Sequence, residues 1–256
     1  MKVSIITVSF NSAHTIADTI QSVLNQDYPD IEYIIVDGNS SDGTVQIIRH
    51  YENQISKWIS EKDQGMYDAM NKGIAMATGD VIGILNSDDV YMNQHVISEL
   101  MGLMHAKNAK VVFADLILVD QEDSNKVLRY YDSGHFHPNK FKYGWMPAHP
   151  TVFVKREVYE AVGKFSTTYQ IAADYEMLIR MLAIQKVRYA YLPKPIVRMR
   201  SGGASTSGLS RNWILNKEIV RACKENGIYS NMAMLLLKLP YKLWSKVLGR
   251  RWKATS

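Results

Sequence analysis

Apolar residues in the first half of the chain follow two alternating patterns. Runs rich in Val and Ile at residues 3–10, 31–36 and 81–85 contain few polar positions. Such a run fits a strand that helices cover on both faces, because neither side then meets water. Between the runs, residues 16–24 and 66–77 carry apolar side chains at the spacing of a helix face. The alternation predicts an α/β fold, with a mostly parallel central sheet and helices on both faces.

The second half of the chain has a less regular pattern. Strands are predicted at residues 110–115, 117–119, 126–131, 151–154 and 187–192, and a helix at 174–184. The Gly, Ser and Thr residues of 199–210 predict a loop. We expect residues 1–115 and 116–210 to form two halves of one domain, followed by a helical region at 211–256.

Composition and charge narrow the function classes. The 256 residues are 46% hydrophobic and 21% charged, which excludes disordered and collagen-like chains. The net charge of +5 comes from the end of the chain, where six basic and no acidic residues follow position 237. The remainder, with 24 basic and 25 acidic residues, is close to neutral, so we expect no nucleic-acid partner. Cys223 alone cannot form an internal disulfide and no signal-peptide pattern opens the chain, so a cytoplasmic location is expected.

Polar residues gather just after the predicted strands of the first half. They lie at Asn11 and at residues 37–42, 63–65 and 86–89. The carboxyl ends of parallel strands meet at one edge of an open α/β sheet, and ligands bind in the crevice there. The sequence therefore predicts one site to which four separate segments contribute.

The adjacent carboxylates of Asp88 and Asp89 carry the strongest chemical signal. Two such groups repel one another unless a cation or a basic group lies between them. Mg²⁺ and Mn²⁺ prefer oxygen ligands, and one or two carboxylates with substrate phosphates are usual surroundings when a diphosphate is bound. The alternative is that Ser87 or Asp88 caps the following helix, which requires one residue and not two.

Other residues of this edge have both a binding and a structural interpretation. The Asp37 carboxylate could accept hydrogen bonds from a nucleotide base or ribose, or Asp37 and Gly38 could form only a turn. Residues 63–65 could line a nucleotide, or form a turn before a solvated helix. Phe10 and Tyr67 could stack on a base, or pack in the core or at its rim.

These segments resemble the family-2 inverting glycosyltransferases, which have the nucleotide-diphospho-sugar transferase fold called GT-A. The matching stretches, in the order and spacing of that family, are residues 3–11, 35–44, 63–65 with 71–73, and 86–89. The resemblance implies a Rossmann-like sheet that binds a nucleotide-diphospho-sugar through Val8, Phe10, Asn11, Asp37, Asp63, Gly65, Asn71 and Asp88. It places Val8, Phe10 and Asp37 around a uracil or guanine and Asp88 on the ribose. It further implies that Asp89, with Asp88 beside it, holds a divalent metal cofactor, Mg²⁺ or Mn²⁺.

The second half resembles the acceptor side of the same family more loosely. The matching stretches are residues 149–153, 163–165 and 173–176. The resemblance implies that Asp174 is the general base, although Ala173 stands where the family often has a second acidic residue. Asp174 could instead cap the helix that follows it.

The expected reaction needs one base on the acceptor side. An acceptor hydroxyl loses its proton as it attacks the anomeric carbon, and the metal offsets charge on the departing diphosphate. Direct displacement with a single base inverts the anomeric carbon. Arg198, Arg200 and the loop at 202–206 could close over the diphosphate, or form a plain surface loop.

His135 and His137 lack a third ligand at the spacing of a metal site, so we expect no metal there. The role of His149, which lies beside the expected acceptor side, stays open.

The basic tail has helical periodicity. Lys238, Lys242, Lys246 and Arg250 recur every four residues, with leucine and tryptophan residues between them. A helix of this kind suits a membrane interface, so we expect peripheral contact with the inner face of the plasma membrane. The alternative is a terminal helix packed on the body of the protein.

The sequence thus predicts a glycosyltransferase that moves one sugar from a nucleotide-diphosphate donor to a glycan or polyprenyl-linked acceptor, in bacterial surface-polysaccharide assembly. One rival is a sugar-nucleotide nucleotidyltransferase, which needs a Gly-rich, Arg-containing loop after the first strand that residues 9–12 lack. Another is a non-catalytic glycan-binding domain, which the presence of Asp88, Asp89 and Asp174 argues against.

Overall fold

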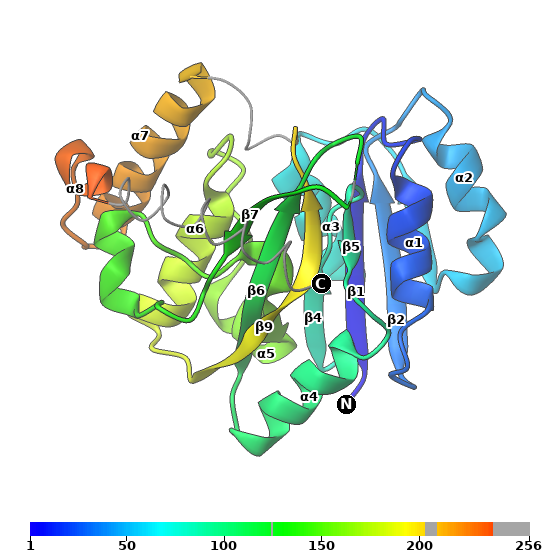
Figure 1. Cartoon of the computed structure of the whole chain (residues 1–256), viewed down its shortest axis with the longest axis horizontal. Helices are drawn as coiled ribbons and strands as arrows, with labels where there is room; N and C mark the ends of the chain where they lie inside the picture. The colour runs from blue at the N-terminus through cyan, green and yellow to red at the C-terminus, as the bar shows by residue number, and fades with distance from the viewer. Residues whose placement is uncertain (124, 203–208, 238–256) are drawn as a thin grey trace.

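A mixed sheet of nine strands forms the centre of the protein (Figure 1). The computed structural model describes residues 1–123, 125–202 and 209–237, and the fold is given for these. The strands are β1 (Val3–Ser9), β2 (Ile31–Asp37), β3 (Lys57–Ser60), β4 (Val81–Ile84), β5 (Asp89–Tyr91), β6 (Val111–Val119), β7 (Val127–Tyr131), β8 (Phe153–Lys155) and β9 (Tyr189–Arg200). Their order across the sheet is β3-β2-β1-β4-β8-β6-β9-β5, and β7 also pairs with β6.

The direction of pairing differs between the two halves of the sheet. Strands β3, β2, β1 and β4 are parallel to one another, as the near-continuous apolar runs predict. Strand β8 is antiparallel to both β4 and β6, while β6 and β9 are parallel. Strands β5 and β7 are antiparallel to β9 and β6. The boundary predicted at residue 115 falls within β6, so one sheet is shared by both halves of the chain.

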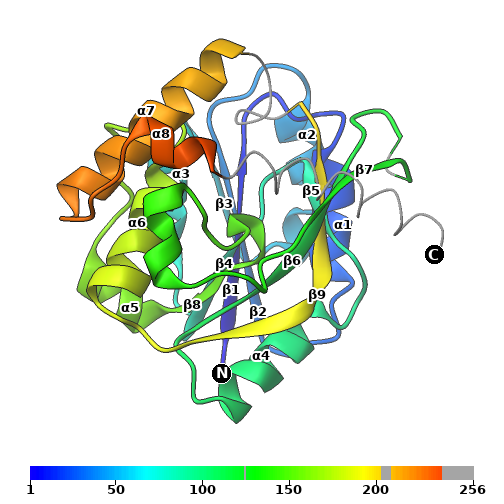
Figure 2. The same ribbon diagram turned by 60° about the vertical axis from the view of Figure 1, so that its left-hand side comes forward.

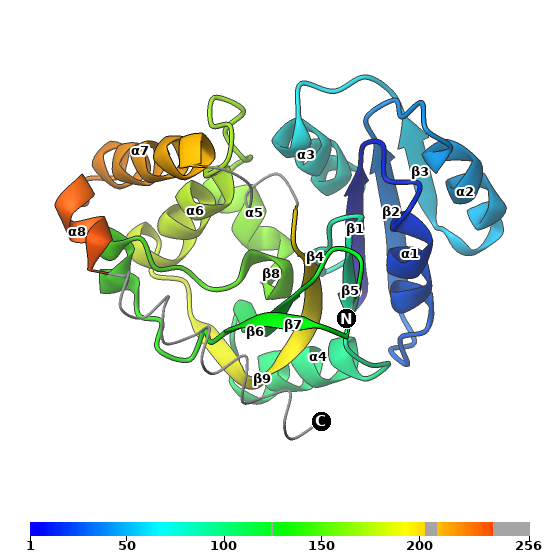
Figure 3. The ribbon, with the colours of Figure 1, turned by 45° about the horizontal axis from the view of Figure 1, so that its top comes forward.

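Helices cover both faces of the sheet. They are α1 (Ile16–Leu24), α2 (Thr44–His50), α3 (Met66–Met76), α4 (Val96–Ala106), α5 (Arg156–Val162), α6 (Ala173–Leu178), α7 (Leu209–Glu225) and α8 (Met232–Leu236). Short 3₁₀ turns lie at η1 (Glu52–Gln54), η2 (Pro138–Tyr143) and η3 (His149–Thr151), and α6 continues as the π-helical η4 (Ile179–Ile184). Figures 2 and 3 show α1 and α2 on one side of the sheet and α5, α6 and α7 grouped on the other.

The alternation of side chains along β1 explains the two covered faces. Ile5 belongs to the same apolar cluster as Ile16 and Ile20 of α1, whereas Ile6 belongs to the cluster that contains Met70 of α3. Successive strand residues point to opposite faces, so each face of β1 has its own helix partner. Two apolar clusters result, one on each side of the sheet.

Strand β9 is longer than the sequence pattern predicted. The predicted strand at 187–192 extends through Pro193 and Pro195 to Arg200. Proline cannot donate a hydrogen bond to a strand neighbour, and the β6–β9 register shifts around Asp115, opposite these prolines. Both Arg198 and Arg200 therefore lie on a strand, and for Arg200 this corrects the predicted loop, which began at residue 199.

No helix among the described residues is long and apolar enough to cross a membrane. Two predicted segments lie outside the part of the chain that the structure describes. They are residues 203–206 of the predicted loop and the predicted tail helix from Lys238 onward.

Candidate active site

The loops after the parallel strands meet at one edge of the sheet. Strand β1 rises from the N terminus in Figure 1, so its carboxyl end and that of the parallel β2 lie at the upper edge. Ser9 and Asp37 are register partners at those two ends. The hydroxyls of Ser12 and Ser87 are 2.8 Å apart and join the loop after β1 to the segment that carries Asp88 and Asp89. The structure therefore brings the predicted donor-side segments together.

Asp89 is a fully buried carboxylate with an incomplete set of hydrogen bonds. Its Oδ2 accepts a bond of 3.2 Å from Asn86 Nδ2, whereas its Oδ1 has no partner among the described residues. Burial, and then the negative charge of Asp88, raise the pKa of Asp89 well above its ordinary value. Burial also raises the pKa of Asp88, while the Arg200 guanidinium lowers both values. A buried carboxylate in this state needs a proton or a cation.

Two arginines of β9 lie close to the acidic pair. Strand β5 begins at Asp89, and its pairing with β9 sets Asp89 opposite Met199, between Arg198 and Arg200 in the chain. Arg200 Nη2 donates a bond of 2.6 Å to Asp18. Arg198 Nε and Arg200 Nη1 are buried and have no acceptor among the residues described. These N–H groups are suited to an anionic ligand such as a diphosphate.

The donor set at Asp88 and Asp89 fits an open magnesium or manganese site. The unpaired Oδ1 of Asp89 is an oxygen ligand of the kind these cations prefer. The described residues contain no cluster of three or more His, Cys, Asp or Glu side chains that could hold a metal. A cation here would thus complete its coordination with substrate phosphates and water, as Mg²⁺ usually does, and not with further side chains.

Asp37 organises the ends of three segments. Its buried carboxylate accepts hydrogen bonds from the hydroxyls of Ser9, Ser40 and Ser60 and from the Ser40 backbone N–H. These bonds occupy both carboxylate oxygens. Contact between Asp37 and a nucleotide base, as the resemblance implies, would require exchange of one of them.

Phe10 is the exposed aromatic side chain of this edge. It is 65% exposed, whereas Val8 of β1 is buried. A Cβ atom at Gly38 would lie 2.5 Å from the Asp63 carboxylate and 3.4 Å from the Phe10 ring, so a larger residue there would displace the Asp63 side chain. Phe10 and Asp63 therefore both lie close to Gly38, beside the Asp37 loop.

Asn11 and Gly65 have backbone conformations that shape the adjoining loops. Asn11 has a φ of 48°, and its Oδ1 accepts a bond of 3.0 Å from the Ser41 backbone N–H. Gly65 has a φ of 111°, which favours glycine, and its N–H donates to Asp63 Oδ1. Both predicted residues thus lie in turns next to the predicted donor surface.

Two side chains of α3 bind the second half of the chain. Asn71 is buried, donates to the Phe165 carbonyl at 2.9 Å and accepts from the Phe165 N–H at 2.8 Å. Its polar atoms are therefore committed to Phe165, where the resemblance implied a donor contact. Tyr67 is only 4% exposed and stacks on Phe165, so it packs in the core and offers no face to a base.

Asp174 is the second residue of α6 and not its N-cap residue. The N-cap position is Ala172, and Asp174 Oδ1 accepts from the Tyr175 N–H at 2.8 Å. The Asp174 carboxylate therefore binds one N–H group of the first turn from inside the helix. Burial raises the pKa of Asp174, while the charge of His149 and a hydrogen bond from Tyr67 lower it. A carboxyl group with a raised pKa is suited to accept a proton.

The three histidines considered from the sequence differ in their surroundings. His149 is the first residue of η3 and lies near Asp174, and its burial lowers its pKa. His135 lies 3.4 Å from Asp132, and His137 accepts from the Asn139 N–H at the start of η2. Each of the latter two has a local structural partner.

Sequence reasoning missed the link between Tyr67 and Asp174. The Tyr67 hydroxyl donates to Asp174 Oδ1 at 3.3 Å and also to the Ile171 carbonyl. The two residues are 107 positions apart, and no local pattern connects them.

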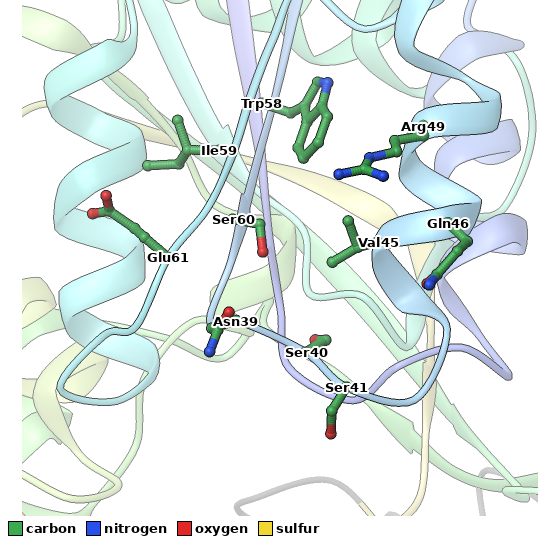
Figure 4. Close-up of a pocket in the computed structure, with 10 residues that line it drawn as sticks. All are labelled: Asn39, Ser40, Ser41, Val45, Gln46, Arg49, Trp58, Ile59, Ser60 and Glu61. Atoms are coloured by element: carbon green, nitrogen blue, oxygen red, sulfur yellow. The ribbon is translucent and has the colours of Figure 1, made fainter.

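A pocket of about 690 Å³ lies outside this site, between α2 and the edge strand β3 (Figure 4). Trp58 and Arg49 extend toward it, and Ser40 and Ser60, which line it, are also donors to Asp37. None of the acidic residues of the predicted site lines the pocket.

Sequence comparison decides the family of the chain. A model of glycosyl transferase family 2 matches residues 4–163, more than half of the sequence. The chain belongs to glycosyl transferase family 2. This glycosyltransferase is 24% identical over 251 residues to a PGL/p-HBAD biosynthesis glycosyltransferase of Mycobacterium bovis, covering 96% of this chain and 92% of that protein.

Solved structures share the fold of this family-2 glycosyltransferase. TarS 1–349 of S. aureus, in complex with UDP-GlcNAc, superposes with a TM-score of 0.67 at 18% identity, over 93% of this chain and 72% of that chain. The mannosyltransferase PcManGT of Pyrobaculum calidifontis, in complex with GDP-Man and Mn²⁺, gives a TM-score of 0.66 at 20% identity, over 100% of this chain and 75% of that chain. A longer TarS chain is covered to 39% of its length. The predicted GT-A fold is confirmed, and similarity at this identity extends no further than the fold.

Proposed function

We propose that this family-2 glycosyltransferase moves one sugar from a nucleotide-diphosphate donor to a hydroxyl of a glycan or lipid-linked acceptor, with inversion at the anomeric carbon. The observation that carries the proposal is the buried, unpaired Oδ1 of Asp89 next to Asp88 and Arg200. Such a group is stable when a cation shares it with a diphosphate. The complexes of TarS with UDP-GlcNAc and of PcManGT with GDP-Man and Mn²⁺ support a donor of this class.

On the donor side, Phe10 presents a ring on which a base can stack, and Asp88 is the candidate for the ribose. Asp89, with Asp88 beside it, would hold Mg²⁺ or Mn²⁺, which supplies positive charge against the charge that develops on the departing diphosphate. Arg198 Nε and Arg200 Nη1 carry N–H groups that have no acceptor among the described residues. These groups are candidates to donate hydrogen bonds to the diphosphate oxygens.

On the acceptor side, Asp174 accepts the proton of the attacking hydroxyl. Its raised pKa favours proton uptake, and the hydrogen bonds from Tyr67 and the Tyr175 N–H orient its Oδ1. With one base and no second carboxylate nucleophile, the hydroxyl displaces the diphosphate directly. That displacement inverts the configuration of the anomeric carbon.

We further propose that the protein works in the cytoplasm at the inner face of the plasma membrane, in assembly of a surface polysaccharide. Leu236 and Leu237, at the end of α8, are 60% and 66% exposed and directly precede the basic tail sequence. Exposed apolar side chains next to a run of cations are suited to an anionic membrane surface.

Hydrolysis of a panel of UDP- and GDP-sugars, with Mg²⁺, with Mn²⁺ and with chelator, tests the proposal. The wild type should release nucleoside diphosphate from at least one donor only when metal is present, and Asp89→Ala should not. Asp120→Ala is the matched control, because Asp120 is a carboxylate whose partner is Lys126 and which lies outside the proposed site. The absence of metal-dependent turnover by the wild type with every donor would contradict the proposed function.

A further inference from the structure

Helix α7 holds the segment that leads into Asp174. Arg221 donates from Nη2 to the Thr168 hydroxyl at 3.0 Å, and Glu225 accepts from the Tyr169 hydroxyl at 2.5 Å. The next three residues of the segment bind a single side chain of the same helix, Glu218. Residues 168–172 therefore lie along α7 before the chain enters α6.

Glu218 accepts three backbone hydrogen bonds. Its Oε1 accepts from the Gln170 N–H at 2.7 Å, and its Oε2 accepts from the Ile171 and Ala172 N–H groups at 2.9 Å each. The side chain is only 9% exposed, so water screens these bonds little. Hydrogen bonds to a carboxylate are roughly twice as strong as those between neutral groups. One side chain thus determines the path of three consecutive residues.

Glu218 binds the chain at the point where helix α6 begins. The N-cap residue is Ala172, which makes no side-chain capping bond, and its backbone N–H is one of the three that Glu218 accepts. A negative charge near the first turn also favours a helix through its dipole. Glu218 therefore fixes the backbone that leads into α6.

The same segment is held from the opposite side by α3. The Tyr67 hydroxyl donates to the Ile171 carbonyl and to Asp174 Oδ1. Ile171 is thus bound at its N–H by Glu218 and at its carbonyl by Tyr67. The backbone three residues before the proposed base has little freedom to move.

We infer that Glu218 is a positioning residue for Asp174. By holding the backbone before Asp174, Glu218 sets the direction from which the proposed base approaches the acceptor hydroxyl. The inference rests on the proposed function, because it presupposes that Asp174 is the base. The hydrogen bonds of Glu218 go to the backbone of residues 170–172, on the acceptor side, so it should act on turnover and not on donor binding.

The test compares Glu218→Gln with Glu160→Gln. Glutamine has the shape of glutamate but turns one acceptor oxygen into an N–H donor, which at position 218 faces a backbone N–H. Because a displacement of about 1 Å can cost a hundredfold in rate, kcat of Glu218→Gln should fall by about tenfold to a hundredfold with the donor KM unchanged. Glu160 is an exposed carboxylate of α5 that pairs with Arg156 and does not touch residues 168–172, so Glu160→Gln should keep kcat within about twofold. Adding Glu218→Gln to Asp174→Asn should cause no further loss.

The outcomes separate this inference from the proposed function. If Asp174→Asn is inactive and Glu218→Gln turns over like the wild type, Glu218 has no positioning role. If Asp174→Asn turns over like the wild type, the proposed base is wrong, and the inference falls with it. Calorimetric binding of UDP or GDP shows that each variant is folded. Amide hydrogen exchange provides a second readout, because the N–H groups of residues 170–172 should exchange slowly in the wild type, and unprotected exchange there would overturn the inference.

Discussion

The hydroxyl of Tyr67 on α3 lies 3.3 Å from Oδ1 of Asp174 on α6 and donates a hydrogen bond to it. Helix α3 begins just after the Asp63 loop of the donor side, and Asp174 is the proposed base of the acceptor side. The bond therefore joins the two halves of the proposed site through one buried side chain.

Replacement of Tyr67 by Phe should move the acid limb of the pH profile to higher pH. The Tyr67 bond stabilises the charged form of Asp174 and so lowers its pKa. Without the bond the pKa rises, and a larger fraction of Asp174 is protonated at a given pH. A hydrogen bond worth about 1 kcal/mol corresponds to a fall of about fivefold in kcat/KM on the acid side. Tyr159→Phe is the control, since Tyr159 is a buried tyrosine of the same apolar cluster, and its profile should match the wild type. Equal acid limbs for all three proteins would refute this reading.

Asp89→Asn should stabilise the metal-free protein while it abolishes metal-dependent turnover. The pKa of Asp89 is raised in the folded state, so its ionised form destabilises the fold at neutral pH. Replacement of this buried, ionised carboxylate by a neutral amide should add about 1–3 kcal/mol to the free energy of unfolding. The wild type gains stability relative to the variant as the pH falls through the folded pKa, so the difference should shrink in acid. Chemical denaturation in chelator at several pH values measures it, and a less stable variant at neutral pH would contradict the prediction.

Asn71→Ala should weaken the fold and leave nucleotide affinity unchanged. It removes both bonds to the Phe165 backbone and leaves two buried groups unpaired, at a cost of about 2–4 kcal/mol. Urea unfolding and calorimetric titration with UDP or GDP report the two quantities separately. The opposite pattern, with unchanged stability and weak nucleotide binding, would favour the donor contact that the family resemblance implies.

Phe10→Ala should weaken nucleotide binding with little change in stability. The ring is 65% exposed, so its removal uncovers little of the core. Loss of base stacking on an aromatic ring costs about 1–3 kcal/mol, or roughly tenfold to a hundredfold in affinity. Phe10→Tyr keeps the ring and should bind like the wild type. A Phe10→Ala protein with full affinity would show that the base lies elsewhere.

The strands and helices that the sequence predicted in the first half of the chain agree with the structure to within one or two residues at their ends, because their signals are local, whereas β5 and α4 were not predicted. The apolar runs of β1 and β2 and the helical stripe of α1 each lie within ten residues. The second half depends on distant partners. Strand β9 continues through Pro193 and Pro195 because β6 pairs with the residues on either side of them, which no local propensity indicates.

The candidate site also combines features that local sequence signals predict with features that depend on distant partners. The clustering of residues 37–42 and 86–89 at one edge follows from the parallel order of the strands, so it could be predicted. The roles of Asn71 and Glu218 could not, because their partners are backbone groups 94 and 46 to 48 positions away. A family motif indicates which residues recur, but it does not separate a side chain that binds the donor from one that holds the framework.

The anomeric configuration of the sugar released from a donor tests the central claim most directly. A UDP- or GDP-sugar with an α-linked sugar is incubated with the protein and Mn²⁺, and ¹H NMR records the first minutes, before the sugar mutarotates. Direct displacement predicts that the β anomer appears first, and that Asp174→Asn forms it about 10²- to 10⁴-fold more slowly because the general base is lost. Initial release of the α anomer, or an undiminished rate in Asp174→Asn, would contradict direct displacement with Asp174 as the base.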